Sequence, residues 1–319
     1  EESDVDGWLT NLGDTPSATP EGEAGGMARL VGQAGGRLHA LARLFDLNPL
    51  ERAAILTALA PEVELDYGNL YAYVQDDVTK KYPTLNLVAA LWCDTLEERL
   101  LARQVLSPES VLRSHLLVTY DDSPGHNTPL LSRPFVLDPR IASYLLGGNE
   151  PDPVLAGATR LIYPERGDMQ HDDPQVTALA QVASSLMPSR NDEYDVWNGE
   201  PKQRRGLTVW MRGPESRGKR DAAEHTAGLL GVHLLVIDAP QMVASVANLR
   251  LGLQRVLREA RLQGSPVFWA RADVLLARKE EGGADLGAEL TRALAEWPGC
   301  AMFDLKTAPP PESSHQTHL

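Results

Sequence analysis

The sequence reads Gly213-Pro214-Glu215-Ser216-Arg217-Gly218-Lys219-Arg220 between an apolar run and a stretch of helical composition. This is the G-x-x-x-x-G-K spacing of a phosphate-binding loop, in which backbone N–H groups surround phosphate oxygens and the lysine contacts the terminal phosphates. The motif requires a buried strand before it and a helix after it. Residues 206–212 and 219–230 have those two patterns. We therefore predict a P-loop fold, with all eight residues as candidates for binding ATP or ADP.

The hydrolytic parts of such a site are altered. Arg220 stands where the motif has Ser or Thr, whose hydroxyl normally binds Mg²⁺. A neighbouring strand should end in acids, but Ala270 and Arg271 occupy those positions. The sequence thus argues against a Mg²⁺ site, and Arg220 and Arg271 could instead place positive charge near the phosphates of a metal-free nucleotide. No residues have the spacing of a metal site.

Two aspartates remain as candidate acids. Asp273 is the candidate catalytic residue, although its position also suits a helix N-cap. Asp238 ends a second apolar strand and could contact ribose or metal, or cap the following helix. Whether the chain is an enzyme therefore stays open.

The C-terminal half has an alternating pattern. Strands are predicted at 207–211, 232–238, 266–272 and 300–305, with helices at 219–230, 243–262 and 285–297 between them. Such alternation predicts an α/β domain, a parallel sheet covered on both faces, over residues 206–306.

Residues 27–150 have a different order. Helices are predicted at 27–45, from Asn48-Pro49 to Pro61, at 66–80, 83–92 and 96–106, and in a short segment capped by Ser107. Strands at 116–120 and 130–137 follow, and a helix capped by Asp138 closes the region. Helices followed by a hairpin predict an α+β, winged-helix-like domain. DNA binding is not favoured, because the last helix before the hairpin offers only Arg113 and His115 as cations and Asp121-Asp122 lies at the hairpin tip.

The remaining segments are polar. We predict a disordered acidic segment at 1–26, a linker with one helix at 151–205, and a disordered tail at 307–319. The formal net charge of −14 argues against broad binding to nucleic acid or anionic membranes. No apolar run reaches the ~20 residues of a membrane span. The two cysteines cannot form a disulfide framework, so we expect a reducing, cytoplasmic location.

Several blocks resemble a known family. They are Leu59-Ala-Pro-Glu-Val63, Tyr67-Gly-Asn-Leu-Tyr-Ala-Tyr-Val-Gln-Asp-Asp-Val-Thr79, Pro83-Thr-Leu-Asn-Leu-Val88, Leu130-Leu-Ser-Arg-Pro134 and Leu137-Asp-Pro-Arg-Ile141. They look like those of bacterial AAA+ ATPases with a winged-helix N-terminal region, a kind associated with contractile phage-tail-like injection systems. In that family pattern Gly213, Gly218 and Lys219 match the nucleotide loop, whereas residues 270 and 271 do not match the acidic strand end.

The resemblance implies ATP-driven remodelling or assembly by an oligomeric ring. It also implies an arginine finger and a small helical lid carrying a sensor residue after the last strand, and the sequence stops before them. We therefore expect the N-terminal part of a longer AAA+ protein, with a degenerate site that binds ATP or ADP weakly or without hydrolysis. The alternatives are a non-enzymatic interaction scaffold and an active ATPase that uses Asp273 or Asp238. Expected partners are further copies of the chain or other protein subunits, not membrane or nucleic acid.

Overall fold

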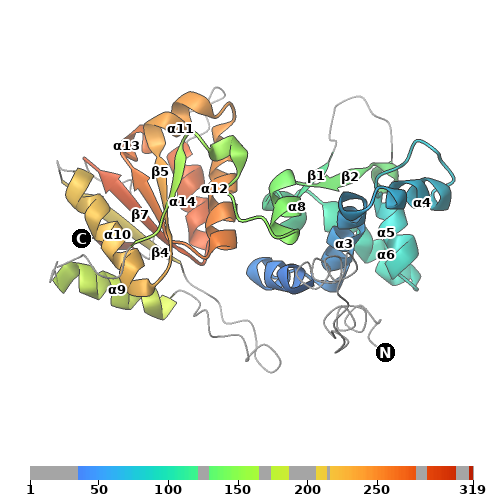
Figure 1. The fold of residues 1–319 in the computed structure, drawn as a ribbon, viewed down its shortest axis with the longest axis horizontal. Coiled ribbons are helices and arrows are strands. Elements are labelled where there is room, and N and C mark those ends of the chain that lie inside the picture. The colour runs from blue at the N-terminus through green and yellow to red at the C-terminus, as the bar shows by residue number, and fades with distance from the viewer. Residues whose placement is uncertain are drawn as a thin grey trace, which may run out of the picture. The chain divides into compact units, whose positions relative to one another are not determined.

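The computed structural model describes residues 35–120, 129–164, 174–186, 206–213, 216–277, 286–306 and 316–318. The chain divides into two compact units, Glu1–Glu150 and Pro151–Leu319 (Figure 1). In the part of the chain that is described, no helix is long and apolar enough to cross a membrane.

The first unit consists of helices followed by a small hairpin. Residues 35–45 are helical. The further elements are α3 (Pro49–Val63), α4 (Asp66–Val74), α5 (Leu85–Trp92), α6 (Leu96–Ala102), η1 (Arg103–Leu106), α7 (Val111–Ser114), β1 (Val118–Tyr120), η2 (Leu130–Ser132), β2 (Phe135–Leu137) and α8 (Pro139–Leu145). Strands β1 and β2 pair antiparallel, with Val118 opposite Leu137. The predicted acidic hairpin tip, and residues 27–34 of the first predicted helix, lie outside the described residues.

Side-chain caps fix where these helices begin. Asn48 accepts a hydrogen bond from the Glu51 N–H while the Glu51 carboxylate accepts from the Asn48 N–H, a complete capping box. Thr84 caps α5 and Asp138 caps α8. The predicted starts at 48–49, 83–84 and 138–139 are confirmed within a residue or two. The cap of α7 is Ser110 and not Ser107, so that prediction was wrong.

The predicted end of α3 at Pro61 was also wrong, because the helix continues to Val63 with Pro61 inside it. A proline cannot donate to the carbonyl four residues earlier, which here belongs to Thr57. The Tyr71 hydroxyl donates to that Thr57 oxygen at 2.8 Å and satisfies it. Tyr71 is buried, and burial raises its pKa to about 12.

The third helix is shorter than predicted. Helix α4 ends at Val74 rather than near residue 80, and Asp76 adopts a left-handed backbone with φ of 51°. The Gln75 amide donates to the carbonyls of Tyr71, Lys80 and Tyr82. Its oxygen accepts from the Thr84 hydroxyl at 2.7 Å. These bonds replace the helical ones and hold the turn between α4 and α5.

The second unit is built on one sheet. Its elements are η3 (Pro153–Leu155), β3 (Thr159–Ile162), α9 (Pro174–Leu186), β4 (Leu207–Arg212), α10 (Ser216–Leu230), β5 (Leu234–Asp238), α11 (Ala239–Ser245), α12 (Leu249–Gln263), β6 (Val267–Ala270), α13 (Asp273–Leu276), α14 (Leu286–Glu296), β7 (Cys300–Leu305) and β8 (Gln316–His318). The strand order is β3-β5-β6-β7-β4-β8. Strand β3 runs antiparallel to β5 and the other pairs are parallel, so the predicted α/β architecture is confirmed.

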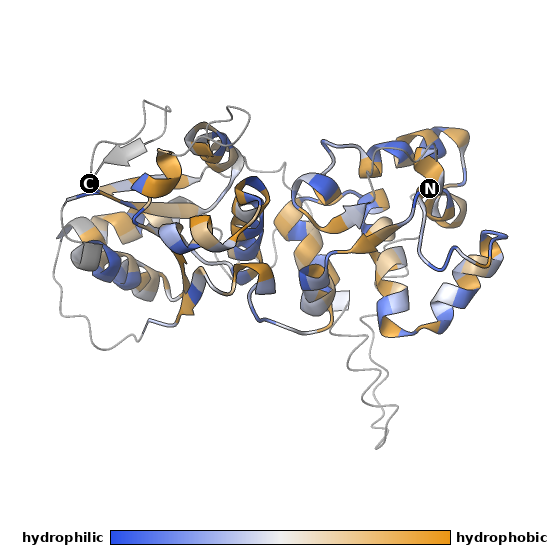
Figure 2. Cartoon of the chain, turned by 90° about the horizontal axis from the view of Figure 1, so that it is seen from above, coloured by the Kyte–Doolittle hydropathy of each residue, from blue (hydrophilic) through white to orange (hydrophobic). Residues whose placement is uncertain are grey.

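Helices cover both faces of this sheet (Figure 1). Helices α9 and α10 pack on one face, and α11, α12 and α14 on the other. Hydrophobic and hydrophilic residues alternate around the helices, as Figure 2 shows, because one face of each meets a core. On the second face Trp210 of β4 and Trp269 of β6 both stack on Phe303 of β7, with ring centroids 4.5 and 5.8 Å from it. This aromatic row ties three neighbouring strands together.

Two predictions about this unit need correction. The segment 151–162, assigned to a linker, contains η3 and the edge strand β3. The predicted helix at 243–262 is two helices, since Asn248 has extended backbone and caps a new start for α12. The C-terminal segment 307–319 was predicted to be disordered; three of its residues form β8, and the rest lie outside the described part.

Candidate functional site

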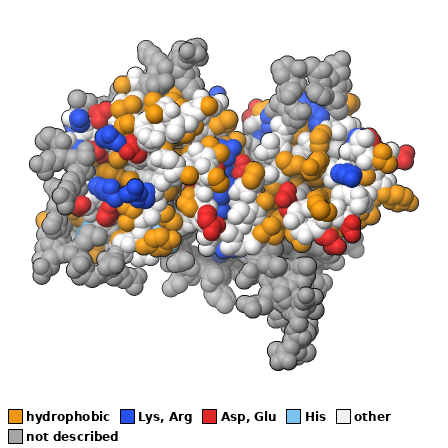
Figure 3. Space-filling model, turned by 45° about the horizontal axis from the view of Figure 1, so that its top comes forward, with side chains coloured by type: hydrophobic (Ala, Val, Ile, Leu, Met, Phe, Trp, Pro, Cys, Tyr) orange, Lys and Arg blue, Asp and Glu red, His pale blue; other side chains and the backbone are white. Residues whose placement is uncertain are grey.

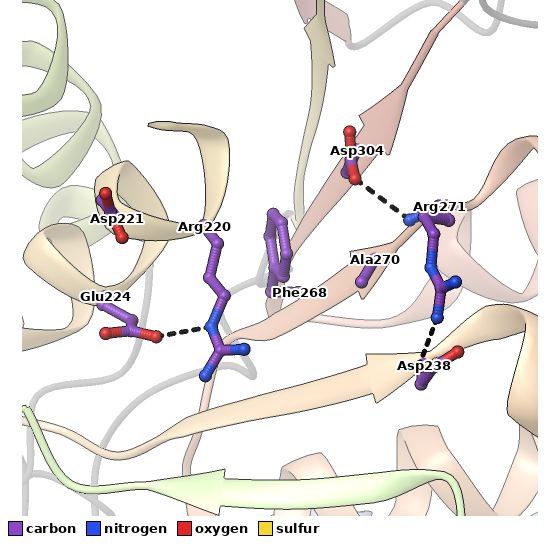
Figure 4. Close-up of a pocket in the computed structure, with 8 residues that line it drawn as sticks. All are labelled: Arg220, Asp221, Glu224, Asp238, Phe268, Ala270, Arg271 and Asp304. Atoms are coloured by element: carbon purple, nitrogen blue, oxygen red, sulfur yellow. Dashed lines mark hydrogen bonds and ion pairs between the residues drawn. The ribbon is translucent and has the colours of Figure 1, made fainter. Parts of the chain in front are cut away.

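An open cleft of about 580 Å³ lies at the carboxyl ends of the parallel strands (Figure 4). Helix α10 forms one side, and the ends of β5, β6 and β7 form the other. Ligands of open α/β sheets bind at this edge. The lining residues are Arg220, Asp221, Glu224, Asp238, Phe268, Ala270, Arg271 and Asp304.

The predicted phosphate loop lies beside this cleft. Only residues 213–215 separate β4 from α10, and Gly213 has φ of 142°, a conformation that favours glycine. Pro214 and Glu215, and the side chains of Ser216 and Arg217, lie outside the described part. Helix α10 starts at Ser216, three residues before the predicted start at Lys219, so Gly218 also lies in its first turn.

Lys219 points inward, and its ammonium group has three hydrogen-bond acceptors within the protein. Its ammonium donates to the Gly213 carbonyl at 2.7 Å, to the Leu305 carbonyl at 2.8 Å and to the Asp304 carboxylate. The side chain is only 10% exposed. A lysine ammonium has three N–H donors, and these three contacts equal that number. The lysine therefore links the start of α10 to the end of β7.

Asp304 is the residue at this site that sequence reasoning missed. Its side chain is 1% exposed, and besides Lys219 it accepts from the Arg271 N–H at 3.1 Å. It lies near the end of β7, the strand between β4 and β6. The signal was present, since a lone carboxylate near the end of an otherwise apolar strand needs a buried partner.

The two arginines expected near phosphates are paired with acids. Arg220 contacts Glu224 one turn further along α10 at 2.7 Å. Arg271 contacts Asp238 across the strand ends, and its backbone has φ of 55°. Figure 4 shows the two guanidinium groups on opposite sides of the cleft, each beside its own carboxylate. Both pairs are partly exposed, so each is worth little in stability.

The two candidate acids have structural contacts. Asp238 accepts from the Gln241 N–H at 3.1 Å and caps α11, the alternative that the sequence favoured. Asp273 is not an N-cap, because α13 begins at Asp273 itself and its carboxylate accepts from the Lys306 N–H. Asp273 is not among the residues that line the cleft. Across the described residues, no three His, Cys, Asp or Glu side chains are grouped to hold a metal ion.

The two cations of the first unit's short helix are also engaged. The Arg113 guanidinium donates to the Leu106 carbonyl and lies 5.2 Å from the centre of the Tyr120 ring. His115 lies against Phe45, with ring centroids 5.2 Å apart. Both side chains therefore make contacts within the first unit.

Comparison with known families addresses the first unit. Residues 27–159 match the family model described as "Winged helix domain, variant". Residues 27–159 form a winged-helix domain. The match extends nine residues past Glu150, into the segment that the structure packs with the second unit. No curated protein matches the chain.

Proposed function

We propose that the second unit is an AAA+-like P-loop module in which the lysine of the nucleotide site forms a buried ion pair that links α10 to β7. In this proposal it binds ATP or ADP weakly and does not hydrolyse ATP, and the chain serves in the assembly or remodelling of a protein complex. The AAA+ resemblance of the sequence blocks supports the class, and so does the mostly parallel α/β sheet with the glycine-rich loop between β4 and α10.

The contacts of Lys219 carry the proposal. The lysine of a phosphate loop must direct its N–H groups at phosphate oxygens. Here the same groups reach two carbonyls and the buried Asp304 carboxylate. A phosphate has to displace a buried ion pair before it can use the lysine, and that displacement leaves Asp304 in an apolar strand without its cation. Weak binding follows from this competition.

The charges of the cleft support the same conclusion. The basic groups Lys219, Arg220 and Arg271 each face a carboxylate. Asp221 adds a further acid to the lining. Among the described residues of the cleft, acidic groups thus match or outnumber the basic ones that a polyphosphate would meet, whereas tight sites combine oriented N–H groups with cations. The acids expected at residues 270 and 271 are also missing, which leaves water activation unsupported.

Calorimetry on the purified chain tests this function. We expect ADP and ATP to bind with dissociation constants on the order of 1 mM, with little change on adding Mg²⁺, and no phosphate release. Asp304→Asn frees Lys219 from its counter-charge without changing side-chain size, so we expect it to bind ADP about tenfold more tightly.

Asp221→Asn is the matched control. It removes one negative charge from the same cleft without touching Lys219, so its affinity should stay close to that of the parent chain. Micromolar binding with steady hydrolysis by the parent chain, lost in Lys219→Ala, would refute the proposal. A complete lack of binding in the parent and in Asp304→Asn would leave only the scaffold alternative.

A further inference from the structure

The winged-helix domain displays a cluster of large apolar side chains around α4. Only Gly68, Tyr71 and Ala72 of this helix are buried. We call the exposed set the α4 face: Leu65 (85% exposed), Tyr67 (40%), Leu70 (51%), Tyr73 (84%), Val74 (48%) and Val78 (82%). Leu65 and Val78 flank α4 and the other four lie on it. Single exposed apolar residues are ordinary, but so many within 14 residues indicate an interaction surface.

This face is held in place by hydrogen bonds behind it, of which the one from Tyr71 is buried. The Tyr71 hydroxyl fixes the inner side of α4 to α3 through the Thr57 carbonyl. The Gln75 amide and the Thr84 hydroxyl fix the turn that carries Val78. The apolar side chains are thus presented by a preorganised support, which lowers the entropy cost of binding.

Acidic residues outnumber basic ones in the segment that carries the face. Glu62, Glu64, Asp66, Asp76 and Asp77 lie within or beside it in the sequence, against Lys80 and Lys81. Lys80 already lies 3.7 Å from Asp77. At the right-hand edge of Figure 3, acidic side chains lie beside hydrophobic ones on this unit. A surface of this composition attracts a partner with apolar and basic groups together.

The same charge argument excludes two other occupants. Residues 1–26 contain seven Asp or Glu and no Lys or Arg, so the chain's own N-terminal segment would meet like charges. A second copy in a symmetric contact would place the same acidic rim against itself, and the whole chain has a formal net charge of −14.

We propose that the α4 face is the docking site for a basic amphipathic helix of another protein. Tyr67, Leu70 and Val74 lie three and four residues apart, so they form one stripe along α4 against which a second helix can pack. Tyrosine suits such a contact because its ring is large and loses little entropy on binding. The acidic rim then orients the partner and accelerates its association.

Photo-crosslinking tests this site in the full chain. A benzophenone amino acid replaces Tyr73 in one variant and Asn86, an exposed polar position on α5, in the control. Both are expressed in cells that naturally contain the protein, and the crosslinked peptide is sequenced by mass spectrometry. We expect position 73 to capture a peptide of another protein that has net positive charge and apolar residues three and four apart.

A charge reversal provides the second arm. Glu62→Lys with Glu64→Lys alters the rim at the C-terminal end of α3, where cations are compatible with the helix dipole. We expect a roughly tenfold lower crosslinking yield from position 73, because rim charges set the encounter rate. The matched control, Glu109→Lys with Glu150→Lys, reverses two exposed acids elsewhere in the domain and should retain the yield.

The remaining outcomes overturn the proposal. They are a crosslink to residues 1–34 or to a second copy, a captured peptide that is acidic or uniformly polar, equal yields at positions 73 and 86, and no crosslink at all. An unchanged yield after reversal of Glu62 and Glu64 also overturns it.

Discussion

Lys219 and Asp304 are stable inside the protein because each neutralises the other. The carboxylate is 1% exposed and the lysine 10%. Removing one member of such a pair leaves a desolvated charge, whereas removing both leaves none. The sequence indicated that Asp304 needs a partner but not which one, because Lys219 lies 85 residues away and the glycine motif already assigned it to phosphate.

Stability measurements can therefore show whether Lys219 is a buried member of an ion pair or a solvated lysine available to phosphate. We expect Lys219→Ala to lower the free energy of unfolding by about 3–5 kcal/mol, because it removes the cation that neutralises Asp304. The double variant Lys219→Met with Asp304→Leu should lose less unfolding free energy than the sum of the losses in Lys219→Met alone and Asp304→Leu alone. Urea titration of each gives these free energies.

Lys306→Ala is the matched lysine control. Its side chain is exposed, so its effect should stay within about 0.5 kcal/mol. If Lys219→Ala changes the free energy of unfolding as little as Lys306→Ala does, Lys219 is not a member of a stabilising buried ion pair.

Local chemistry set the starts of elements more firmly than their ends. Asn48 and Thr84 could be recognised as caps because each acts within three residues of itself. The ends depended on distant groups. Helix α3 passes Pro61 because a hydroxyl from α4 serves the Thr57 carbonyl. The break between α11 and α12 could not be recognised in the sequence, because the helical spacing of apolar residues continues across residues 246–248.

The contact between η3 and α12 provides a test at the scale of elements. Asp152 of the η3 cap accepts from Arg255 at 2.7 Å and from Arg258 at 2.6 Å. Burial alone would raise the pKa of Asp152, but the Arg255 and Val154 hydrogen bonds and both positive charges outweigh it and hold the pKa below 3.8. A depressed folded-state pKa stabilises the protein above the unfolded value and loses this effect as pH falls through the folded value.

We therefore expect the unfolding free energy to fall more steeply below pH ~4 in the parent chain than in Asp152→Asn. At pH 7 the variant should be less stable by about 3 kcal/mol, since Arg258 is buried beside the lost charge. Denaturant titrations at several pH values measure both effects. Asp94→Asn, an exposed change, should leave the steep acid limb intact; equal slopes for the parent and Asp152→Asn would contradict the assignment.

At the scale of the whole molecule, each unit has a core of its own. The apolar alternation after residue 206 was sufficient to predict the parallel strands, because fully covered strands are almost continuously apolar. Strand β3 was missed because Thr159–Ile162 is short and antiparallel and is soon followed by a polar run. The helix-then-hairpin order similarly predicted the winged-helix domain, whose hairpin strands are only three residues each.

Because each unit has its own core, we expect a core substitution in one unit to increase hydrogen exchange in that unit alone. Phe303→Ala removes the middle ring of the aromatic row and should cost about 3–5 kcal/mol in the second unit. Hydrogen exchange followed by mass spectrometry should show faster exchange in β4, β6 and β7, with α3 and α5 unchanged. Ile55→Ala, in a fully buried position of α3, should give the reverse pattern. A uniform response to either change would indicate one cooperative unit.

The position of β3 also decides where the chain can be cut. A fragment that begins at residue 206, directly before β4, would discard β3 and Asp152 together. Strand β5, of which four of five residues are buried, would then become a bare edge with unpaired N–H and carbonyl groups. Such an edge recruits strands from other molecules and leads to aggregation. A fragment that begins at Pro151 keeps the edge covered and retains the whole sheet.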